Sequence, residues 1–128
     1  MLSACDTGRG PFNVAGGEGV YALPRAFHLA GCPNVVASLW KVDDDATAAL
    51  MGVFYRHLWV DKLPPLEALR RAQLYLYRHP SAIPALAKRR GEQFAEVDLP
   101  KETVKPGEPA KHAPTSQWAA FVLSGTGR

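Results

Sequence analysis

The fold is decided by the first ten residues, which read Met1-Leu2-Ser3-Ala4-Cys5-Asp6-Thr7-Gly8-Arg9-Gly10. Apolar residues that stop abruptly before Asp, Thr and Gly predict a buried strand that ends at Cys5. In an open α/β sheet, ligands bind at strand ends because the loops leaving them line a crevice. A thiol held there on rigid backbone is suited to nucleophilic chemistry, provided that a base takes its proton. The alternative is that Cys5 is a small buried apolar residue.

The next residues predict a loop, a helix and a second strand. Residues 6–19 are rich in glycine and predict a loop. A helix is expected to begin near Tyr21–Leu23, because Pro24 is tolerated only in a first turn, and to end at Gly31. The apolar run Val35–Trp40 is typical of a parallel strand buried on both faces. Strand, loop, helix and strand together predict one βαβ unit.

Two further helices are predicted between residues 43 and 79. The first has Asp43 or Asp44 as its N-cap and runs to about Trp59. The second opens at Pro64-Pro65 and stops before His79-Pro80, because a residue that precedes proline avoids helical geometry. Their expected buried faces are Ala46, Ala49, Leu50, Val53, Phe54 and Leu58 on the first, and Leu66, Leu69, Ala72, Gln73 and Leu76 on the second. An ion pair is expected between Glu67 and Arg71.

The remainder of the chain predicts a surface excursion and a last strand. Residues 88–117 are charged and interrupted by prolines, and Ser81–Ala87 is expected to form a short helix before them. The run Trp118–Leu123 predicts the final strand. We therefore expect an α/β fold with a mostly parallel sheet flanked by helices. Its first strand has one bare edge, so we expect residues 1–128 to be the C-terminal part of a larger domain.

Several separate motifs resemble the CHAT family of caspase-like domains. They occur in order as Leu2-Ser-Ala-Cys-Asp-Thr-Gly8, Gly17-Glu-Gly19, Leu23-Pro-Arg-Ala-Phe27, Val36-Ala-Ser-Leu-Trp-Lys-Val-Asp-Asp44 and Trp118-Ala-Ala-Phe-Val-Leu-Ser-Gly125. The resemblance implies a partial caspase-like three-layer fold and a cysteine endopeptidase with Cys5 as nucleophile. CHAT domains often follow tetratricopeptide repeats in bacterial proteins, so such a region is an expected partner.

The family's catalytic histidine lies in a His-Gly motif upstream of the Cys strand, and no such motif precedes Cys5 here. Of the four histidines, His28, His57, His79 and His112, none is expected at a strand end beside Cys5, and each is predicted to be a surface or capping residue. We therefore expect a truncated reading frame whose product is inactive alone. The alternative is a non-catalytic interaction module or remnant, which pairs with a second chain that supplies the missing half.

The resemblance also implies a substrate-binding set. Asp6 is expected to face the substrate, or else to close an Asx turn. Ser38, Trp40 and Asp43 belong to the segment beside which a peptide substrate lies extended, so strand addition is expected there. Trp40 is expected either to wall the pocket or to pack in the core.

Composition excludes several other classes of protein. A net charge of +3 with interspersed signs does not predict nucleic-acid or membrane binding, and two cysteines do not make a secreted disulfide framework. The expected location is the cytoplasm. No metal or cofactor is expected: the acids at 43–45 diverge at a helix start, and Pro24 prevents a helix from beginning at the Gly17-Glu-Gly19 turn of a dinucleotide site. A peptide or protein substrate remains the expected partner.

Overall fold

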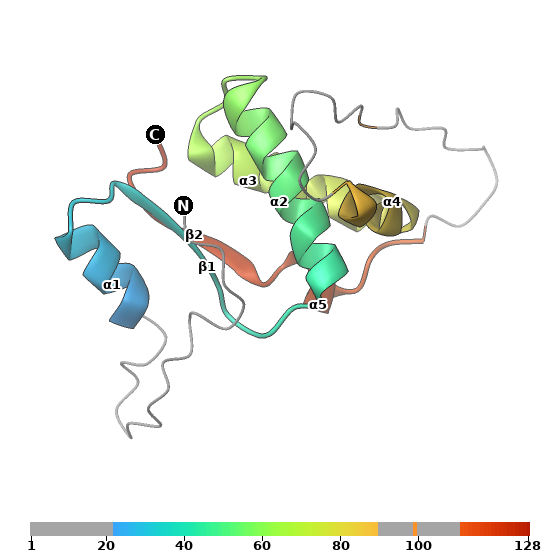
Figure 1. The fold of residues 1–128 in the computed structure, drawn as a ribbon, viewed down its shortest axis with the longest axis horizontal. Coiled ribbons are helices and arrows are strands. Elements are labelled where there is room, and N and C mark those ends of the chain that lie inside the picture. Colours follow the sequence, from blue (N-terminus) through green and yellow to red (C-terminus); the bar gives the residue numbers. More distant parts are fainter. Residues whose placement is uncertain (1–21, 90–98, 100–110) are drawn as a thin grey trace.

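The computed structural model describes residues 22–89, 99 and 111–128, so Cys5 and Asp6 lie outside the described residues. In chain order the elements are α1 (Ala22–Leu29), β1 (Asn34–Ser38), α2 (Asp44–Trp59), α3 (Pro65–Arg78), the 3-10 turn η1 (Pro80–Ala82), α4 (Ile83–Lys88), α5 (Thr115–Trp118) and β2 (Phe121–Gly125). In Figure 1 the β1–β2 ribbon runs between α1 at the left and the cluster of α2, α3 and α4 at the right. None of these described helices is long and apolar enough to cross a membrane.

The sheet of the described residues has two antiparallel strands. Residues 34–38 of β1 pair with residues 125–121 of β2, so that Val36 lies opposite Leu123 and Ser38 lies opposite Phe121. The described residues contain both helices and strands, as predicted. The predicted parallel sheet is not found in the described part of the chain, where β1 pairs with an antiparallel neighbour.

The last strand begins later than predicted. We expected it at Trp118, but residues 115–118 form the short helix α5 and the strand starts at Phe121. The indole Nε1–H of Trp118 donates to the carbonyl of Ala113, 3.2 Å away, inside this turn. This local hydrogen bond fixes Trp118 in helical geometry, although its apolar neighbours favour a strand.

Helix α1 begins and ends as predicted. Gly31 follows the helix with a φ of +95°. The N–H of Gly31 donates to the carbonyl of His28, and the N–H of Cys32 donates to that of Phe27. These two bonds form a Schellman motif, which satisfies carbonyl groups at the helix end and needs positive φ at the C′ residue.

Helices α2 and α3 form most of the core. The predicted buried residues of α2 are confirmed except Leu58, which is partly buried, and the predicted pairing of Glu67 with Arg71 is confirmed at 2.8 Å. Leu66 was predicted to be buried on α3 but is 59% exposed, because the buried stripe passes through Ala68 instead. Gln73 donates from Nε2 to the carbonyl of Phe121, 2.8 Å away, which ties α3 to β2.

The predicted surface excursion is wrong at its C-terminal end. Residues 90–98 and 100–110 lie outside the described residues, but Ala113 is buried and its N–H donates to the carbonyl of Tyr77 over 2.9 Å. The ring of His112 stacks on Tyr77 with centroids 4.3 Å apart, and Leu99 packs against the core. Residues after 111 therefore return to the core before β2 begins.

Two glycine-to-alanine substitutions are expected to change stability in opposite directions. A Cβ at either Gly31 or Gly52 meets no atom within 4 Å, so backbone conformation alone decides the effect. Gly31→Ala places a side chain at positive φ and is expected to lower the free energy of unfolding by about 1–2 kcal/mol. Gly52→Ala lies inside α2 and is expected to raise it by about 0.5–1 kcal/mol. Urea unfolding of both variants measures the two shifts, and equal signs would contradict the assignment of Gly31 as the C′ residue.

Candidate functional site

An apolar pocket of about 490 Å³ lies on one face of the β ribbon. Side chains alternate along a strand, so residues 34, 36 and 38 of β1 share this face with their partners 125, 123 and 121 of β2. Helix α2 covers the pocket with Met51, Phe54, Tyr55 and Leu58. Phe27 and Cys32 also line it, and so do Val35 and Val36 of β1, which point to opposite faces. The pocket therefore reaches around the edge of β1 that β2 does not occupy.

Of the predicted substrate-binding residues within the described part of the chain, Ser38 alone lines this pocket. It is the last residue of β1 and is 2% exposed. Its position opposite Phe121 places it on the pocket face of the ribbon. Its hydroxyl is one of the few polar groups in a predominantly apolar lining, together with the side chain of Asn34 and the hydroxyl of Tyr55.

Trp40 packs in the core, in agreement with the second of its two predicted roles. It is half-buried against the core cluster, and its Nε1–H donates to the carbonyl of Ser116 over 3.1 Å. This bond joins the segment after β1 to helix α5. The indole therefore fixes the path of the backbone between β1 and α2 and does not line the pocket.

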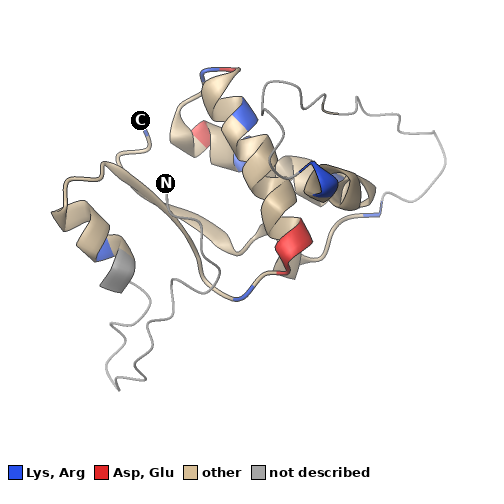
Figure 2. Cartoon of the chain, in the orientation of Figure 1, with Lys and Arg blue, Asp and Glu red and all other residues tan. Residues whose placement is uncertain are grey.

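Asp43 is the N-cap of α2. Its Oδ1 accepts from the N–H of Asp45 at 2.9 Å and from the N–H of Ala46 at 3.0 Å. The carboxylate also lies at the positive end of the helix dipole, where Asp44 and Asp45 add negative charge, and this end of α2 is acidic in Figure 2. The side chain of Asp43 is thus engaged by the helix start and does not line the pocket.

Asp43→Ala is expected to lower the free energy of unfolding by about 1 kcal/mol, because two backbone N–H groups lose their acceptor. Asp43→Asn keeps an acceptor oxygen and serves as the matched control, with a smaller loss expected. Thermal or urea unfolding of the three proteins measures the difference. Equal losses in the two variants would show that capping is not the main role of this side chain.

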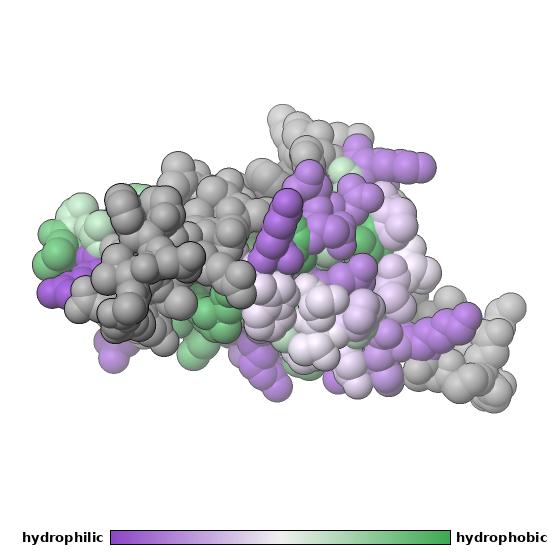
Figure 3. Space-filling model, turned by 90° about the horizontal axis from the view of Figure 1, so that it is seen from below, coloured by the Kyte–Doolittle hydropathy of each residue, from purple (hydrophilic) through white to green (hydrophobic). Residues whose placement is uncertain are grey.

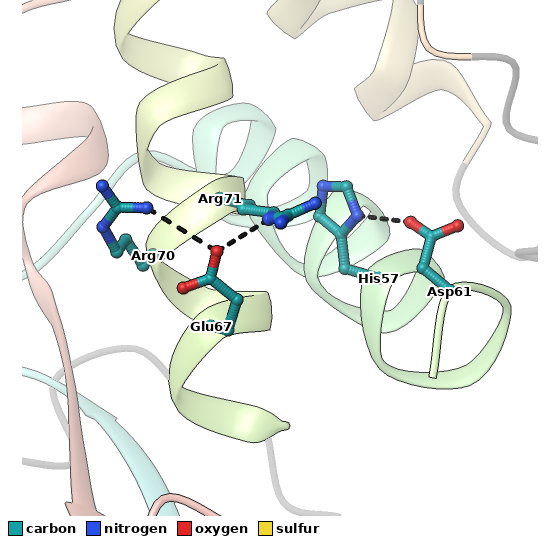
Figure 4. A network of polar contacts seen from close by, with 5 residues as sticks. All are labelled: His57, Asp61, Glu67, Arg70 and Arg71. Atoms are coloured by element: carbon teal, nitrogen blue, oxygen red, sulfur yellow. Dashed lines mark hydrogen bonds and ion pairs between the residues drawn. The ribbon is translucent and has the colours of Figure 1, made fainter. Parts of the chain in front are cut away.

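His57 is the histidine whose predicted surface position is wrong. It is 9% exposed near the end of α2, and its Nδ1 lies 2.6 Å from Oδ2 of Asp61 (Figure 4). Helix α3 runs past this side of α2, so the imidazole is covered although it occupies a predicted capping position. The N–H of Leu63 donates to the carbonyl of His57, so this pair closes the turn between α2 and α3.

The other histidines also have structural contacts. His28 bonds to the carbonyl of Cys32 through Nδ1 and to Oγ of Ser124 through Nε2. Nδ1 of His79 lies 3.0 Å from the carbonyl of Tyr75, on whose ring it stacks, and His112 stacks on Tyr77. None of the four imidazoles lines the apolar pocket in the described part of the molecule.

A cluster of charged residues covers the outer face of α3 beside His57 (Figure 4). Glu67 accepts from Nε of Arg71 at 2.8 Å and lies 3.6 Å from Nη1 of Arg70. The hydrogen bond from Arg71, with the charges of Arg70, Arg71 and His57, holds the pKa of Glu67 below its ordinary value. Because a lowered pKa in the folded state favours folding above the unfolded pKa, this contribution is lost as pH falls through the folded pKa.

Glu67→Gln is expected to lower the melting temperature slightly at pH 7, and this effect is expected to shrink as the pH falls through the lowered pKa of Glu67. The effect is small because Glu67 lies at the surface, where solvent screens its ion pairs. Melting temperatures of wild type and variant across this pH range measure the difference. A difference that grows toward low pH would contradict the assigned role of Arg71.

Metal binding finds no support among the described residues, where no group of three His, Cys, Asp or Glu side chains converges. The one cysteine in this part of the chain, Cys32, is a free thiol beside the apolar pocket. Burial raises the pKa of the Tyr55 hydroxyl, which therefore stays protonated at neutral pH in the pocket wall.

A model of the CHAT domain family matches residues 1–126. The chain belongs to the CHAT domain family. This finding confirms the resemblance seen in the sequence motifs, and it places the chain in a family of caspase-like peptidases. No curated protein and no solved structure matches the chain.

Two features of this CHAT domain were not predicted from its sequence. The first is an additional apolar face of α2, whose residues Met51 and Tyr55 line the pocket. The sequence signal for this face was a set of apolar positions at helical spacing, next to the positions that form the core. The second is the contact between His28 and Ser124. These residues are 96 positions apart, and no sequence pattern links them.

Proposed function

We propose that this chain carries the nucleophile of a CHAT-type caspase-like cysteine endopeptidase, and that the nucleophile is Cys5. The observation that carries the proposal is the family match, which covers the Cys motif at residues 2–8 together with almost all of the chain. Cys5 and Asp6 lie outside the described residues, so their roles rest on the family and on the sequence pattern.

In this proposal, the strand that ends at Cys5 pairs in parallel with β1 and extends the ribbon into the sheet of a caspase-like three-layer fold. Among described residues β1 has a partner on one edge only, and the apolar pocket reaches the other edge. In a parallel pair, the C-terminal end of this strand would lie at the same edge of the sheet as the C-terminal end of β1, which is Ser38. Cys5 would then lie beside the segment from Ser38 to Asp43, which the family uses for substrate.

The reaction begins when a base takes the proton of the Cys5 thiol. The thiolate attacks the peptide carbonyl, the amine leaves with a proton, and water then cleaves the thioester. We assign the base for Cys5 to a histidine in a His-Gly motif outside this chain's four histidines, because among the described residues none of these lines the pocket that holds Ser38. The glycine N–H of that motif is one expected oxyanion donor, and the loss of one such donor costs about 3–4 kcal/mol of transition-state stabilisation. The chain alone is therefore expected to be inactive.

The substrate is a peptide, which we propose to bind by strand addition beside residues 38–43. The side chains of Trp40 and Asp43 attach this segment to the rest of the fold, through hydrogen bonds to the carbonyl of Ser116 and to the first N–H groups of α2. Its backbone is thus held in place for a substrate strand. Asp6 is proposed to face the residue that precedes the cleaved bond.

A non-catalytic role is the second candidate. The edge of β1 that lacks a described partner suits pairing with another chain, either one that supplies the upstream half or a tetratricopeptide-repeat region. We propose the cytoplasm as its location in either case, because reduced thiols are the default for a chain with two cysteines.

A peptide-acyl cysteine probe tests the enzyme proposal. The purified chain is expected to react at Cys5 no faster than free cysteine. When a separately purified upstream fragment with a His-Gly strand is added, labelling of Cys5 is expected to rise by about 10²-fold or more, as is typical of general-base assistance. Mass spectrometry of the labelled peptides measures both rates.

Cys5→Ala and Cys32→Ala are the matched variants for this experiment. Loss of the increase in Cys5→Ala, with retention in Cys32→Ala, supports Cys5 as the nucleophile. Binding of the upstream fragment without any increase in labelling would contradict the enzyme proposal and support the non-catalytic role.

A further inference from the structure

A serine and a histidine face each other on the side of the ribbon opposite the apolar pocket. Oγ of Ser124 lies 2.9 Å from Nε2 of His28. Ser124 is in β2, opposite Val35 of β1, and His28 is in the last turn of α1. Residues 35 and 124 alternate with residues 36 and 123 along their strands, so Ser124 lies on the face of the ribbon opposite Leu123, where it meets α1.

The second ring nitrogen of His28 determines how the proton is shared. Nδ1 lies 2.8 Å from the backbone carbonyl of Cys32, which can only accept a hydrogen bond. Nδ1 of the neutral ring therefore carries the hydrogen, and Nε2 has the free lone pair. It follows that the hydroxyl of Ser124 donates to Nε2, which is the arrangement of a serine with a general base.

Both groups stand on well-fixed backbone. The carbonyl of Cys32 is positioned by the Schellman turn at Gly31, since the N–H of Cys32 itself bonds to Phe27. Ser124 is held by the β ladder, and just beyond it the N–H of Thr126 donates to the carbonyl of Pro33, 3.2 Å away. The base and the carbonyl that orients it are thus placed by one turn of the chain, and the serine is placed by a strand 96 positions after the base.

The pair opens into a shallow pocket of about 310 Å³, lined by Pro24, Arg25, His28, Leu29 and Ser124. Leu29 is 80% exposed, and apolar and hydrophilic side chains lie side by side at the α1 end of the molecule (Figure 3). An apolar wall beside an exposed guanidinium suits a small acyl group whose carbonyl oxygen becomes negative during reaction. The pocket is too shallow and small for a folded partner.

We propose that Ser124 and His28 form a second nucleophile and base, which takes an acyl group from a small carboxylic ester. Oγ of Ser124 bonds to the ester carbonyl carbon while Nε2 of His28 accepts the hydroxyl proton. The bond from this carbon to the alcohol oxygen breaks, and the alcohol leaves with that proton. Water then attacks the acyl-serine with His28 as base, releasing the carboxylic acid and restoring Ser124. Arg25 faces the developing oxyanion.

A fluorophosphonate probe tests this proposal in the 128-residue chain that carries Cys5→Ala and Cys32→Ala. Removal of both thiols separates the result from the cysteine peptidase proposal and leaves the Cys32 carbonyl in place. Ser124 is expected to be labelled at least about 10²-fold faster than the exposed Ser81, and His28→Gln is expected to remove that advantage. Hydrolysis of a short-chain p-nitrophenyl ester is expected to fall by a similar factor in Ser124→Ala and to be unchanged in Ser81→Ala.

The competing explanation is that the bond between His28 and Ser124 only attaches α1 to β2. In that case Ser124 is labelled no faster than Ser81 while Ser124→Ala still lowers the melting temperature, and this outcome overturns the proposal. If His28→Gln unfolds the chain, the labelling rate of Ser124 relative to Ser81 in the protein with His28 intact decides between the two explanations. Equal rates again overturn it.

Discussion

The close approach of α2 to its neighbours is the constraint on which the rest of the structure depends. Alanines are fully buried along both α2 and α3, at Ala46, Ala49, Ala68 and Ala72. Small side chains let two helix backbones approach closely, while the larger Leu50, Val53 and Phe54 fill the rest of the same buried core. A larger side chain at one of these alanines would push α2 outward, and the cover of the pocket would move with it.

The β ribbon depends on this helix cluster. A hairpin-like pair of strands is marginally stable in water by itself, so β1 and β2 need an apolar surface to pack against. The helix cluster provides this surface. Phe121 of β2 is buried in the same core as α2, and its carbonyl accepts a hydrogen bond from Gln73 of α3. The segment that carries Ser38, Trp40 and Asp43 is thereby fixed at three points: the ribbon, helix α5 and the start of α2.

Local sequence signals predicted the elements well. Pro24, Pro65 and Gly31 act through their own backbone geometry, so the ends of α1 and the start of α3 followed from single residues. Asp43 or Asp44 was predicted as the cap of α2 because a carboxylate oxygen accepts from the first N–H groups of a helix, and Asp43 is the residue that does so. Leu66 was wrongly assigned to the core because helical periodicity permits two neighbouring stripes, and the packing partner selects one of them. Trp118 was assigned to a strand because its neighbours are apolar. Its hydrogen bond to Ala113, which holds it in a turn, depends on the path of the preceding chain and has no signal in the local sequence.

Contacts between residues far apart in the chain could not be predicted from the sequence. The contact between His28 and Ser124 has no signal in the sequence around either residue. It depends on the turn at Gly31 and on the register in which β1 pairs with β2. The burial of His57 likewise depends on α3, which lies later in the chain. For the candidate site, the segment around Ser38 was predicted from the sequence. That the side chains of Trp40 and Asp43 hold this segment in place, and do not line the pocket, followed only from their hydrogen bonds.

The contact between Ala113 and Tyr77 has an evolutionary consequence. The chain that leaves α4 near Arg89 must come back to α3 at Ala113, whatever length of polypeptide connects the two points. Closing a flexible connection costs only about 0.6 kcal/mol more for each doubling of its length. Related domains can therefore differ in the length of this connection at little cost to folding, provided that the contact of Leu99 with the core is kept.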